Sequence, residues 1–392
     1  YCDSNIDRSI CIFMKIGIDC RKFYDSQQNA GAGIERYTYH LVRNLLYQDT
    51  VNQYTLFFYS DISPETIHKI KGSNPRIKIV KMFRASSKLP LWDNHINFTR
   101  LLLKEKLDLT IFPANVIPLF YNKKSLLVVH DLAIYLFPKW FPEKQWFSTR
   151  ILVPRSIKKA KIIVSISQST KKDLIKLFKV NPEKIRVIHP GIVVKDTYFE
   201  EEIKKVKNKF DIKGDYLLFI GTIEPRKNIL NLIKAFSNFL FENEEMNVSL
   251  ILAGIKGWKF KPVFRQLNEI NKRLTTSRIK YVGKISNRER NILLKSCQAF
   301  VFPSHYEGFG FPVLEAMALG APVITANNSS LKEIAEDAAV LIDSKDVNSI
   351  RRAVKQVLED KILRQRLVSQ GRQRSGKFSW EITVKKFMTL LK

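Results

Sequence analysis

The sequence predicts an α/β protein with two parallel sheets, each covered by helices on both faces. Short apolar runs alternate with helical stretches along the chain, the pattern of parallel strands joined by helical crossovers. The pattern is interrupted by a charged stretch near residue 200 and then restarts. The length of 392 residues exceeds one ordinary core and suits two domains of roughly 150 to 200 residues each.

The composition is that of a globular protein with an unusual charge. Hydrophobic residues make up 45% of the chain, and the formal net charge is +29 at pH 7. Such a charge indicates a partner of opposite sign, which is nucleic acid, anionic lipid or a phosphorylated substrate. The charge by itself does not choose among the three.

The sequence predicts neither a membrane-spanning helix nor a cysteine metal site. It has no run of about 18 apolar residues, the length that a spanning helix needs. Its four cysteines lack the spacing of metal ligands, and so few suit a reducing compartment. Residues 1–13 hold only a short apolar patch and Met14 looks like a natural start, so we interpret 1–13 as a non-functional extension.

The first half of the chain contains a series of strand-like runs separated by helical stretches. The helical stretches include 34–47, 95–106 and 144–159. Because ligands of parallel sheets bind at the carboxyl ends of the strands, residues that directly follow a run are candidate site residues. The runs cover residues 15–19, 54–59, 77–82, 109–113, 126–129, 162–166 and 185–188.

Two loops of this half are candidates for ligand binding. Gly31 and Gly33 lie between the first strand and its helix, an order that lets a phosphate sit at the helix N-terminus, although two glycines are more often only a turn. His130 and Asp131 directly follow the run 126–129. A histidine at a strand end is more often structural or solvated, so the residues alone leave both alternatives open.

Basic residues are dense between positions 150 and 186, with apolar residues interleaved at helical spacing. They form either solvated helix faces or a surface for anionic lipid, where each cation near a charged bilayer contributes about 1 kcal/mol. Nearby aromatic side chains could insert into such an interface or bind an acceptor. The basic residues are Arg150, Arg155, Lys158, Lys159, Lys161, Lys171, Lys172, Lys176, Lys179, Lys184 and Arg186. The aromatic residues are Phe137, Trp140, Phe141, Trp146 and Phe147.

The sheet pattern restarts after a charged stretch, 193–213, which we interpret as a linker. The second set of runs covers residues 216–220, 248–253, 279–282, 299–302, 322–325 and 340–342. This set predicts a second unit of the same Rossmann-like architecture. No sequence repeat links the two halves, so only the architecture is repeated.

The first loop of the second unit carries two adjacent cations. It begins with Gly221 and Thr222 and leads into a helix over 229–241. Arg226 and Lys227 would stand just before the helix N-terminus, where cations and free amides can hold a diphosphate. Elsewhere, such a pair would usually be a solvated surface.

The stretch 301–326 predicts a strand, a sharp loop, a helix and a second strand. Gly308 and Gly310 lie in the loop, Pro312 suits the first helical turn, and Gly320 marks the helix end. The first amides of a helix have no internal partners and carry positive potential. The stretch therefore offers an anion site at a helix N-terminus.

Two carboxylates, Glu307 in the loop and Glu315 in the helix, stand eight residues apart in this stretch. Carboxylates accept hydrogen bonds from vicinal hydroxyls, so sugar or ribose hydroxyls beside a phosphate would use every part of the loop. The alternative is a surface turn with two solvated glutamates. The polar residues 327–330 that follow are interpreted as caps of a short helix.

This loop resembles the E-x7-E signature of retaining glycosyltransferases of family four, which have the GT-B fold. The likeness is carried by Glu307-Gly-Phe-Gly-Phe-Pro followed by Leu314-Glu315-Ala316, and it extends over nearly the whole chain from about Lys15 on. Gly31-Ala-Gly33, His130-Asp131 and the ungapped pattern from Gly221 to Asn228 resemble the family as well.

The resemblance implies two Rossmann-like domains whose parallel sheets face a cleft between them. An N-terminal acceptor domain would cover 14–192, a linker 193–213, and a nucleotide-sugar donor domain 214–374. The last segment, 375–392, would form a helix that crosses back to the N-terminal domain.

The resemblance also implies roles for individual residues. Glu307 would hold hydroxyls of the donor sugar and Glu315 those of the ribose, while the loop between them would contact sugar and phosphate through backbone amides. The predicted catalytic residues are Glu307, Arg226, Lys227 and His130. The predicted donor-binding residues are Gly31, Gly33, Gly221, Thr222, Gly308, Phe309, Gly310 and Glu315.

Transfer of a sugar from a nucleoside diphosphate develops negative charge on the leaving phosphate. Many transferases neutralise it with a metal held by an Asp-x-Asp pair, and this sequence contains no such pair. Arg226, Lys227 and the helix N-termini can supply the positive field instead, so we expect no metal or other cofactor. The resemblance implies retention of the anomeric configuration, with the leaving phosphate taking the proton of the acceptor hydroxyl.

Within the family, the sequence looks most like bacterial mannosyltransferases of O-antigen and capsule assembly. GDP-mannose is therefore the first donor, and a polyprenyl-linked or growing glycan is the acceptor. The alternative donor is a UDP-sugar carrying glucose, galactose or N-acetylhexosamine. The expected location is cytoplasmic, peripheral on the inner face of the cell membrane, with its anionic surface as a partner.

Two alternatives to a glycosyltransferase belong to other functional classes. The net charge of +29 would suit a nucleic-acid-binding protein, but no helix-turn-helix, zinc or RNP-type pattern supports it. A sugar-nucleotide-binding scaffold without catalysis is the other alternative. The presence of Glu307, Glu315, Arg226 and Lys227 argues against it.

Overall fold

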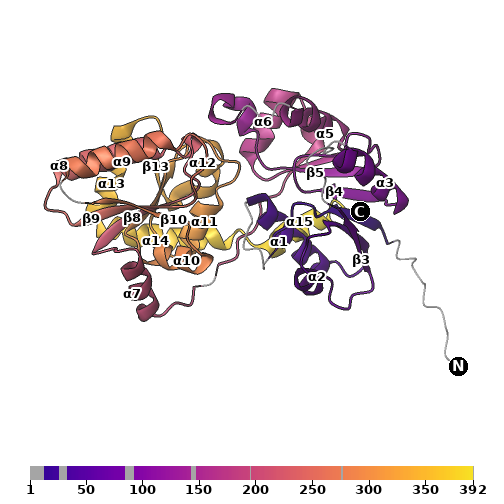
Figure 1. Ribbon diagram of the computed structural model, residues 1–392, viewed down its shortest axis with the longest axis horizontal. Coiled ribbons are helices and arrows are strands. Elements are labelled where there is room, and N and C mark those ends of the chain that lie inside the picture. The colour runs from indigo at the N-terminus through magenta and orange to yellow at the C-terminus, as the bar shows by residue number, and fades with distance from the viewer. Residues whose placement is uncertain are drawn as a thin grey trace.

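The computed structural model describes residues 13–25, 33–83, 92–142, 147–194, 196–274 and 277–391. These residues form two lobes, each an open parallel sheet with helices packed on it (Figure 1). The predicted fold class, α/β with two Rossmann-like domains, is confirmed. The interpretation of 1–13 as an extension falls almost wholly outside the described residues.

The N-terminal sheet contains seven described strands in the order β3-β2-β1-β4-β5-β6-β7, and all neighbours pair in parallel. The interior strands β4 and β5 are buried along their whole length, as expected for a sheet covered on both faces. The strands are β1 (Lys15–Asp19), β2 (Gln53–Tyr59), β3 (Ile77–Met82), β4 (Leu109–Phe112), β5 (Ser125–Val129), β6 (Ile162–Ser165) and β7 (Ile185–Val187).

The C-terminal sheet contains six described strands, also parallel, in the order β10-β9-β8-β11-β12-β13. Its strands are β8 (Asp215–Ile220), β9 (Val248–Ala253), β10 (Ile279–Gly283), β11 (Ala299–Phe302), β12 (Val323–Ala326) and β13 (Val340–Ile342). In each sheet the chain adds strands on one side of the first strand, then crosses back and adds the rest on its other side. This is the doubly wound arrangement.

On both sheets, some helices begin where a side chain satisfies their first amides. Ser167 accepts from the Thr170 amide at the start of α6, and Ser286 and Glu289 form a capping box on α10. The stretch predicted as one helix over 144–159 is described from 147 on, as a π-helix (Ser148–Leu152) followed by α5. The helices are α1 (Gly33–Gln48), α2 (Pro64–Lys71), α3 (Phe98–Lys104), α4 (Ala133–Leu136), α5 (Val153–Lys159), α6 (Gln168–Phe178), α7 (Glu200–Lys209), α8 (Ile229–Glu242), α9 (Lys261–Arg273), α10 (Asn287–Ser296), α11 (Phe311–Ala318), α12 (Ser329–Ala335), α13 (Val347–Glu359), α14 (Lys361–Gly376) and α15 (Trp380–Met388).

The chain leaves the first lobe through α7 and returns to it through α15. Helix α7 packs on α10 of the second lobe, where Lys209 bonds Glu289. In Figure 1 the yellow α15 lies beside the indigo α1 in the N-terminal lobe. There Trp380 is buried and stacks on His40, with 5.4 Å between the ring centroids. The last helix therefore ties the second half of the chain to the first.

The carboxyl ends of strands from both sheets meet between the lobes. Strand β5 ends just before His130, β8 just before Gly221, and β11 just before Pro303. The backbone around His130 lies directly against Gly308, which follows β11 on the other sheet. The fold therefore brings the predicted site residues of both halves to one region.

Candidate active site

The loop after β8 is shaped by close backbone contact and presents two cations. Gly254 has φ +139°, and a Cβ there would lie 1.9 Å from the Gly221 carbonyl oxygen, so only glycine fits. Beyond this contact the chain makes a short 3₁₀ helix, Pro225–Lys227, and turns into α8 through Asn228 in the left-handed conformation. Arg226 and Lys227 are thereby directed toward the loop after β11.

The carboxylate of Glu307 lies between these two cations. Its Oε2 accepts from Nη1 of Arg226 at 2.8 Å, and its Oε1 accepts from Nζ of Lys227 at 2.7 Å. Arg226 also donates from Nη2 to Glu224 at 2.7 Å. Glu307, Lys227 and Glu224 are each more than nine-tenths buried. The three predicted catalytic residues of the second half thus form one buried cluster with Glu224.

The cluster shifts the titration of its members. Burial by itself would raise the pKa of Glu307, but the charges of Arg226 and Lys227 outweigh it and hold that pKa below its usual value. Burial lowers the pKa of Lys227, which Glu307 opposes and the neighbouring Arg226 reinforces. Lys227 also places Nζ over the ring of Phe302, 4.7 Å from its centroid. The result is a carboxylate that stays ionised beside a lysine that gives up its proton more readily.

The backbone of the Glu307 loop is held by the residues predicted to cap α12. The Ser329 hydroxyl accepts from the Glu307 amide at 3.0 Å, and the Ser330 hydroxyl lies 2.8 Å from the Glu307 carbonyl oxygen. Asn328 occupies the N-cap position but makes no side-chain cap; its amide donates to the Ser304 carbonyl at 3.2 Å. The capping interpretation was therefore wrong, because these side chains satisfy the buried loop instead.

The loop enters α11 at Gly310, whose φ of +117° requires glycine. Pro312 occupies the first turn of this helix, as predicted. The side chain of Phe309 is buried against Phe311 and Phe378. Phe309 can therefore contact a ligand in the loop only through its backbone.

Glu315 in α11 is held by arginines from both lobes. Its Oε2 lies 3.2 Å from Nη1 of Arg290 in α10, and its Oε1 lies 3.8 Å from Nη1 of Arg36 in α1. Neither arginine was predicted as a site residue. Glu315 and Glu307 are thus both paired with cations, but with different ones.

The first lobe contributes His130, whose ring and backbone face different ways. The imidazole is buried, donates from Nε2 to the Pro113 carbonyl at 2.6 Å and meets Tyr37 edge to face. Burial lowers the pKa of His130 below its usual value, so the ring is neutral near pH 7. The carbonyl of His130 faces Gly308. The structure thus presents the backbone of His130 to the second lobe.

Replacing Gly308 by alanine is expected to lower sugar transfer by at least about tenfold, because displaced reacting groups lose rate steeply. The added Cβ would lie 2.3 Å from the His130 carbonyl oxygen and 2.7 Å from Cβ of Asp131, so the lobes must move apart. Gly376→Ala is the matched control, because a Cβ there meets nothing within 4 Å. Initial rates of both purified variants check this, and a fully active Gly308→Ala would contradict it.

Four predicted donor-binding positions remain, which are Gly31, Gly33, Gly221 and Thr222. Gly33 is the first residue of α1, and a Cβ there would meet nothing within 4 Å. Gly31 lies outside the described residues. Gly221 directly follows β8, and the methyl group of Thr222 packs close to Gly257. No contact in the structure tests the donor-binding role assigned to any of these positions.

Further contacts between the lobes border the cluster and were not predicted. Tyr306 donates to Asp173 of α6 at 2.6 Å. Glu333 of α12 accepts from the Gln168 amide at the start of α6 at 2.9 Å and lies 2.7 Å from Nε2 of His189. These side chains hold α6 against the loop that carries Glu307.

Three of the aromatic residues predicted to bind an interface or an acceptor contact the second lobe instead. Phe137 lies 5.7 Å from Tyr306, and Trp140 stacks on His305 at 5.6 Å between ring centroids. Phe141 lies 5.9 Å from Trp258. Trp146 lies outside the described residues.

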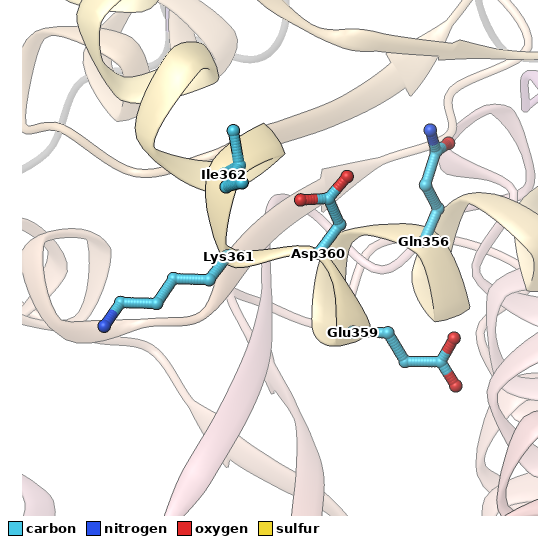
Figure 2. Close-up of a pocket in the computed structure, with 5 residues that line it drawn as sticks. All are labelled: Gln356, Glu359, Asp360, Lys361 and Ile362. Carbon is cyan, nitrogen blue, oxygen red and sulfur yellow. The ribbon is translucent and has the colours of Figure 1, made fainter.

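The described part of the chain offers neither a metal site nor a membrane-spanning helix. Among those residues, no group of three or more His, Cys, Asp or Glu side chains is arranged to hold a metal ion. None of the helices described is both long and apolar enough to cross a membrane. A surface pocket between α13 and α14 is lined by side chains that point in different directions (Figure 2). They are Gln356, Glu359, Asp360, Lys361 and Ile362.

Comparison with known proteins gives a consistent assignment. Residues 31–196 match the family model described as Glycosyltransferase Family 4, and residues 200–374 match the model described as Glycosyl transferases group 1. O-antigen chain mannosyltransferase B of Escherichia coli is 32% identical over 263 residues, which cover 66% of this chain and 68% of that protein. The serotype-specific mannosyltransferase WbdA of the same species is 26% identical over 347 residues, which cover 86% of this chain but only 41% of WbdA.

Solved structures share the fold at low sequence identity. HepE of Anabaena, in complex with UDP and glucose, matches with a TM-score of 0.73 and 17% identity over 96% of this chain and 99% of that one. The sucrose-phosphate synthase of Thermosynechococcus elongatus matches with a TM-score of 0.73 and 18% identity over 96% and 98% of the two chains. With both halves matched by family models and a relative above 30% identity, the chain belongs to glycosyltransferase family four and has the GT-B fold.

Proposed function

We propose that this glycosyltransferase moves a hexose from a nucleotide sugar to a lipid-linked or growing glycan in cell-surface polysaccharide synthesis. The observation that carries the proposal is the buried cluster in which Arg226 and Lys227 both contact Glu307. It offers cations for a diphosphate and a carboxylate for sugar hydroxyls within one hydrogen-bond length of each other. Mannose from GDP-mannose is the first donor, because named relatives are O-antigen chain mannosyltransferases.

In the proposed reaction the cluster exchanges partners with the donor. The diphosphate takes hydrogen bonds from Arg226 and Lys227, and sugar hydroxyls donate to the carboxylate oxygens of Glu307. As the bond between the anomeric carbon and the phosphate breaks, the two cations and the N-terminus of α11 stabilise the leaving charge. The groups are already fixed by the fold, so little reorganisation is needed.

The proposed stereochemical outcome is retention. The acceptor hydroxyl attacks the anomeric carbon from the face that the phosphate leaves, and its proton passes to the departing phosphate oxygen. The new glycosidic bond replaces the bond to phosphate, and the nucleoside diphosphate leaves. This route needs no side-chain base, and the neutral, backbone-bonded imidazole of His130 is compatible with it.

A panel of nucleotide sugars tests the proposed function. The purified chain is incubated with GDP-mannose, UDP-glucose, UDP-galactose or UDP-N-acetylglucosamine, and nucleoside diphosphate release is measured with and without glycan acceptors. GDP-mannose is expected to give the fastest release. Release from none of these donors, in the presence of acceptors that support the named relatives, would contradict the proposal.

A UDP-sugar is the second candidate donor. HepE, which shares the fold, binds UDP and glucose. The family resemblance places the base beside Val282 to Ser286, before α10, with contacts mainly to backbone groups, so we infer that side chains there do not select guanine over uracil. A faster rate with a UDP-sugar than with GDP-mannose would select this candidate.

Catalysis is proposed to proceed without a metal, since Arg226 and Lys227 supply positive charge where the diphosphate binds. Addition of EDTA is therefore expected to leave the rate of transfer within about twofold of the untreated enzyme. Initial rates after extensive dialysis against EDTA, with and without added Mg²⁺ or Mn²⁺, check this. Activity that disappears and returns with the metal would contradict the electrostatic assignment.

An anionic membrane surface is the proposed partner of the N-terminal lobe. Lys124, Lys161 and Lys184 directly precede β5, β6 and β7, so they lie at the amino ends of these strands, opposite the edge that carries His130. The exposed Phe120 lies shortly before Lys124 in sequence, between two residues whose carbonyls bond Lys159. The surface hollow there is lined by Asn122, Lys123, Lys124, Lys159, Ala160, Lys161, Asn181 and Lys184.

Reversing two of these charges is expected to weaken vesicle binding without affecting transfer to a soluble acceptor. Lys123→Glu/Lys124→Glu should lower flotation with phosphatidylglycerol-containing vesicles by at least about tenfold, at about 1 kcal/mol for each lysine lost. Lys204→Glu/Lys205→Glu, two exposed lysines of α7 outside this surface, is the charge-matched control. Equal loss of flotation in both double variants would show that the effect comes from net charge and not from this surface. Absence of flotation by the wild-type protein would contradict the proposed membrane partner.

A further inference from the structure

Arg36 reaches from the first lobe to two helices of the second. It lies in the first turn of α1, and its side chain is one-third exposed. Its Nη2 donates to Oδ1 of Asn287, the first residue of α10, and its Nη1 lies 3.8 Å from Oε1 of Glu315 in α11. One planar guanidinium group therefore connects the N-terminal lobe to the helix that carries Glu315 and to its neighbour.

Arg290 holds the other side of the same carboxylate. Its Nη1 lies 3.2 Å from Oε2 of Glu315, and its side chain is only 14% exposed. Burial lowers the pKa of Arg290, which Glu315 opposes and Arg36 reinforces, but a guanidinium remains protonated at any ordinary pH. Two permanent cations, one from each lobe, thus share one carboxylate.

The contacts of the two arginines with Glu315 differ in length. The 3.2 Å separation fixes Oε2 against Arg290 from the same lobe. The 3.8 Å separation is longer than a hydrogen bond, so Oε1 keeps lone pairs free for a hydroxyl donor. A ribose hydroxyl can therefore bond Oε1 while Arg290 keeps the carboxylate in place.

We infer that Arg36 is a positioning residue for the nucleotide. It orients Glu315 toward the ribose and couples ribose binding to the contact between α1 and α10. The inference rests on the proposed role of Glu315 in donor binding. Because coupling between two binding events is reciprocal, a contact that draws the lobes together must in turn be strengthened by the ribose. Loss of Arg36 then weakens nucleotides that carry ribose hydroxyls more than nucleotides that lack them.

Isothermal titration of two nucleotides tests this inference on the full chain. Wild-type protein, Arg36→Gln and Arg36→Lys are titrated with GDP and with 2′,3′-dideoxy-GDP, and with the uridine pair if GDP does not bind. Arg36→Gln is expected to weaken GDP by about tenfold, within the range of couplings between sites, and to leave the dideoxy nucleotide nearly unchanged. Arg36→Lys keeps the charge but not the planar fork, so it should lose discrimination too.

Controls separate this role from a loss of fold or charge. Arg43→Gln removes an exposed arginine from the same helix and should bind both nucleotides like the wild type. Thermal unfolding of each variant checks that the fold is retained. In a double-mutant cycle, Arg36→Gln should add little to the effect of Glu315→Gln, since both remove the same interaction.

The outcomes distinguish this inference from the proposed function. Discrimination between the nucleotides that is present in the wild type and unchanged in Arg36→Gln would overturn the inference and leave the proposed function intact. Equal weakening of both nucleotides would also overturn it, because a purely electrostatic role does not depend on the ribose hydroxyls. A wild-type protein that binds neither GDP nor UDP would contradict the proposed donor class itself.

Discussion

Glu307→Gln is expected to reduce sugar transfer by about 1,000-fold, the upper range for loss of one fixed electrostatic group. The substitution keeps the size of the side chain but removes the charge that holds Arg226 and Lys227 in place. It also replaces one acceptor oxygen by an amide NH2 group, which donates and cannot accept from a sugar hydroxyl. Initial rates at saturating donor measure the effect.

A folding control is needed because Glu307 is buried between two cations. Breaking a buried ion pair by removing one partner destabilises a protein by about 3 to 5 kcal/mol, so Glu307→Ala can lose activity through unfolding. The glutamine variant avoids the cavity, and its thermal unfolding should be followed in parallel. Glu359→Ala, in the pocket of Figure 2, is the control for loss of an unrelated glutamate. A folded Glu307→Gln enzyme with full activity would refute the assignment.

Lys227→Met is expected to lower transfer by a similar factor of about 1,000, chiefly in kcat, because the cation stabilises charge that develops on the leaving phosphate. Methionine keeps an unbranched side chain of similar length but removes the ammonium group, and with it the contact of Nζ with the Phe302 ring. Lys234→Met, an exposed change in α8, is the matched control and should leave the rate unchanged.

The pH profile gives this assignment a second readout. The protonated form of Lys227 is the active one, so activity falls as the pH rises through its pKa. Burial lowers that pKa below its usual value, and Glu307 only partly opposes the shift. The alkaline limb of the wild-type profile should therefore lie at lower pH than for an ordinary lysine, and it should be absent from the residual activity of Lys227→Met. An identical alkaline limb in both enzymes would contradict this.

The strands and the site loops could be predicted because each is marked by residues close together in the sequence. The apolar run 299–302 is bounded by Pro303, and the structure places β11 at the same residues. Gly310 and Pro312 mark the start of α11, where only glycine tolerates the backbone angle and proline needs no amide partner. Constraints of this kind act between residues close in the sequence, so they can be recognised from the sequence alone.

The partners of the site residues could not be predicted, because they come from distant parts of the chain. Glu333 bonds the start of α6 from 165 residues away, and Arg36 meets Asn287 across 251 residues. The sequence pattern assigned Ser329 and Ser330 to helix capping, since these residue types satisfy helix amides wherever amides are free. In the fold these two serines instead form hydrogen bonds with the buried backbone of Glu307.

The most direct measurement is a crystal structure of the wild-type chain with GDP-2-fluoro-mannose, a donor analogue that resists transfer. We expect sugar hydroxyls within hydrogen-bond distance of Glu307, the diphosphate on Arg226 and Lys227, and the ribose on Glu315. A donor bound elsewhere, with Glu307 still held by both cations as in the structure without ligand, would contradict the account.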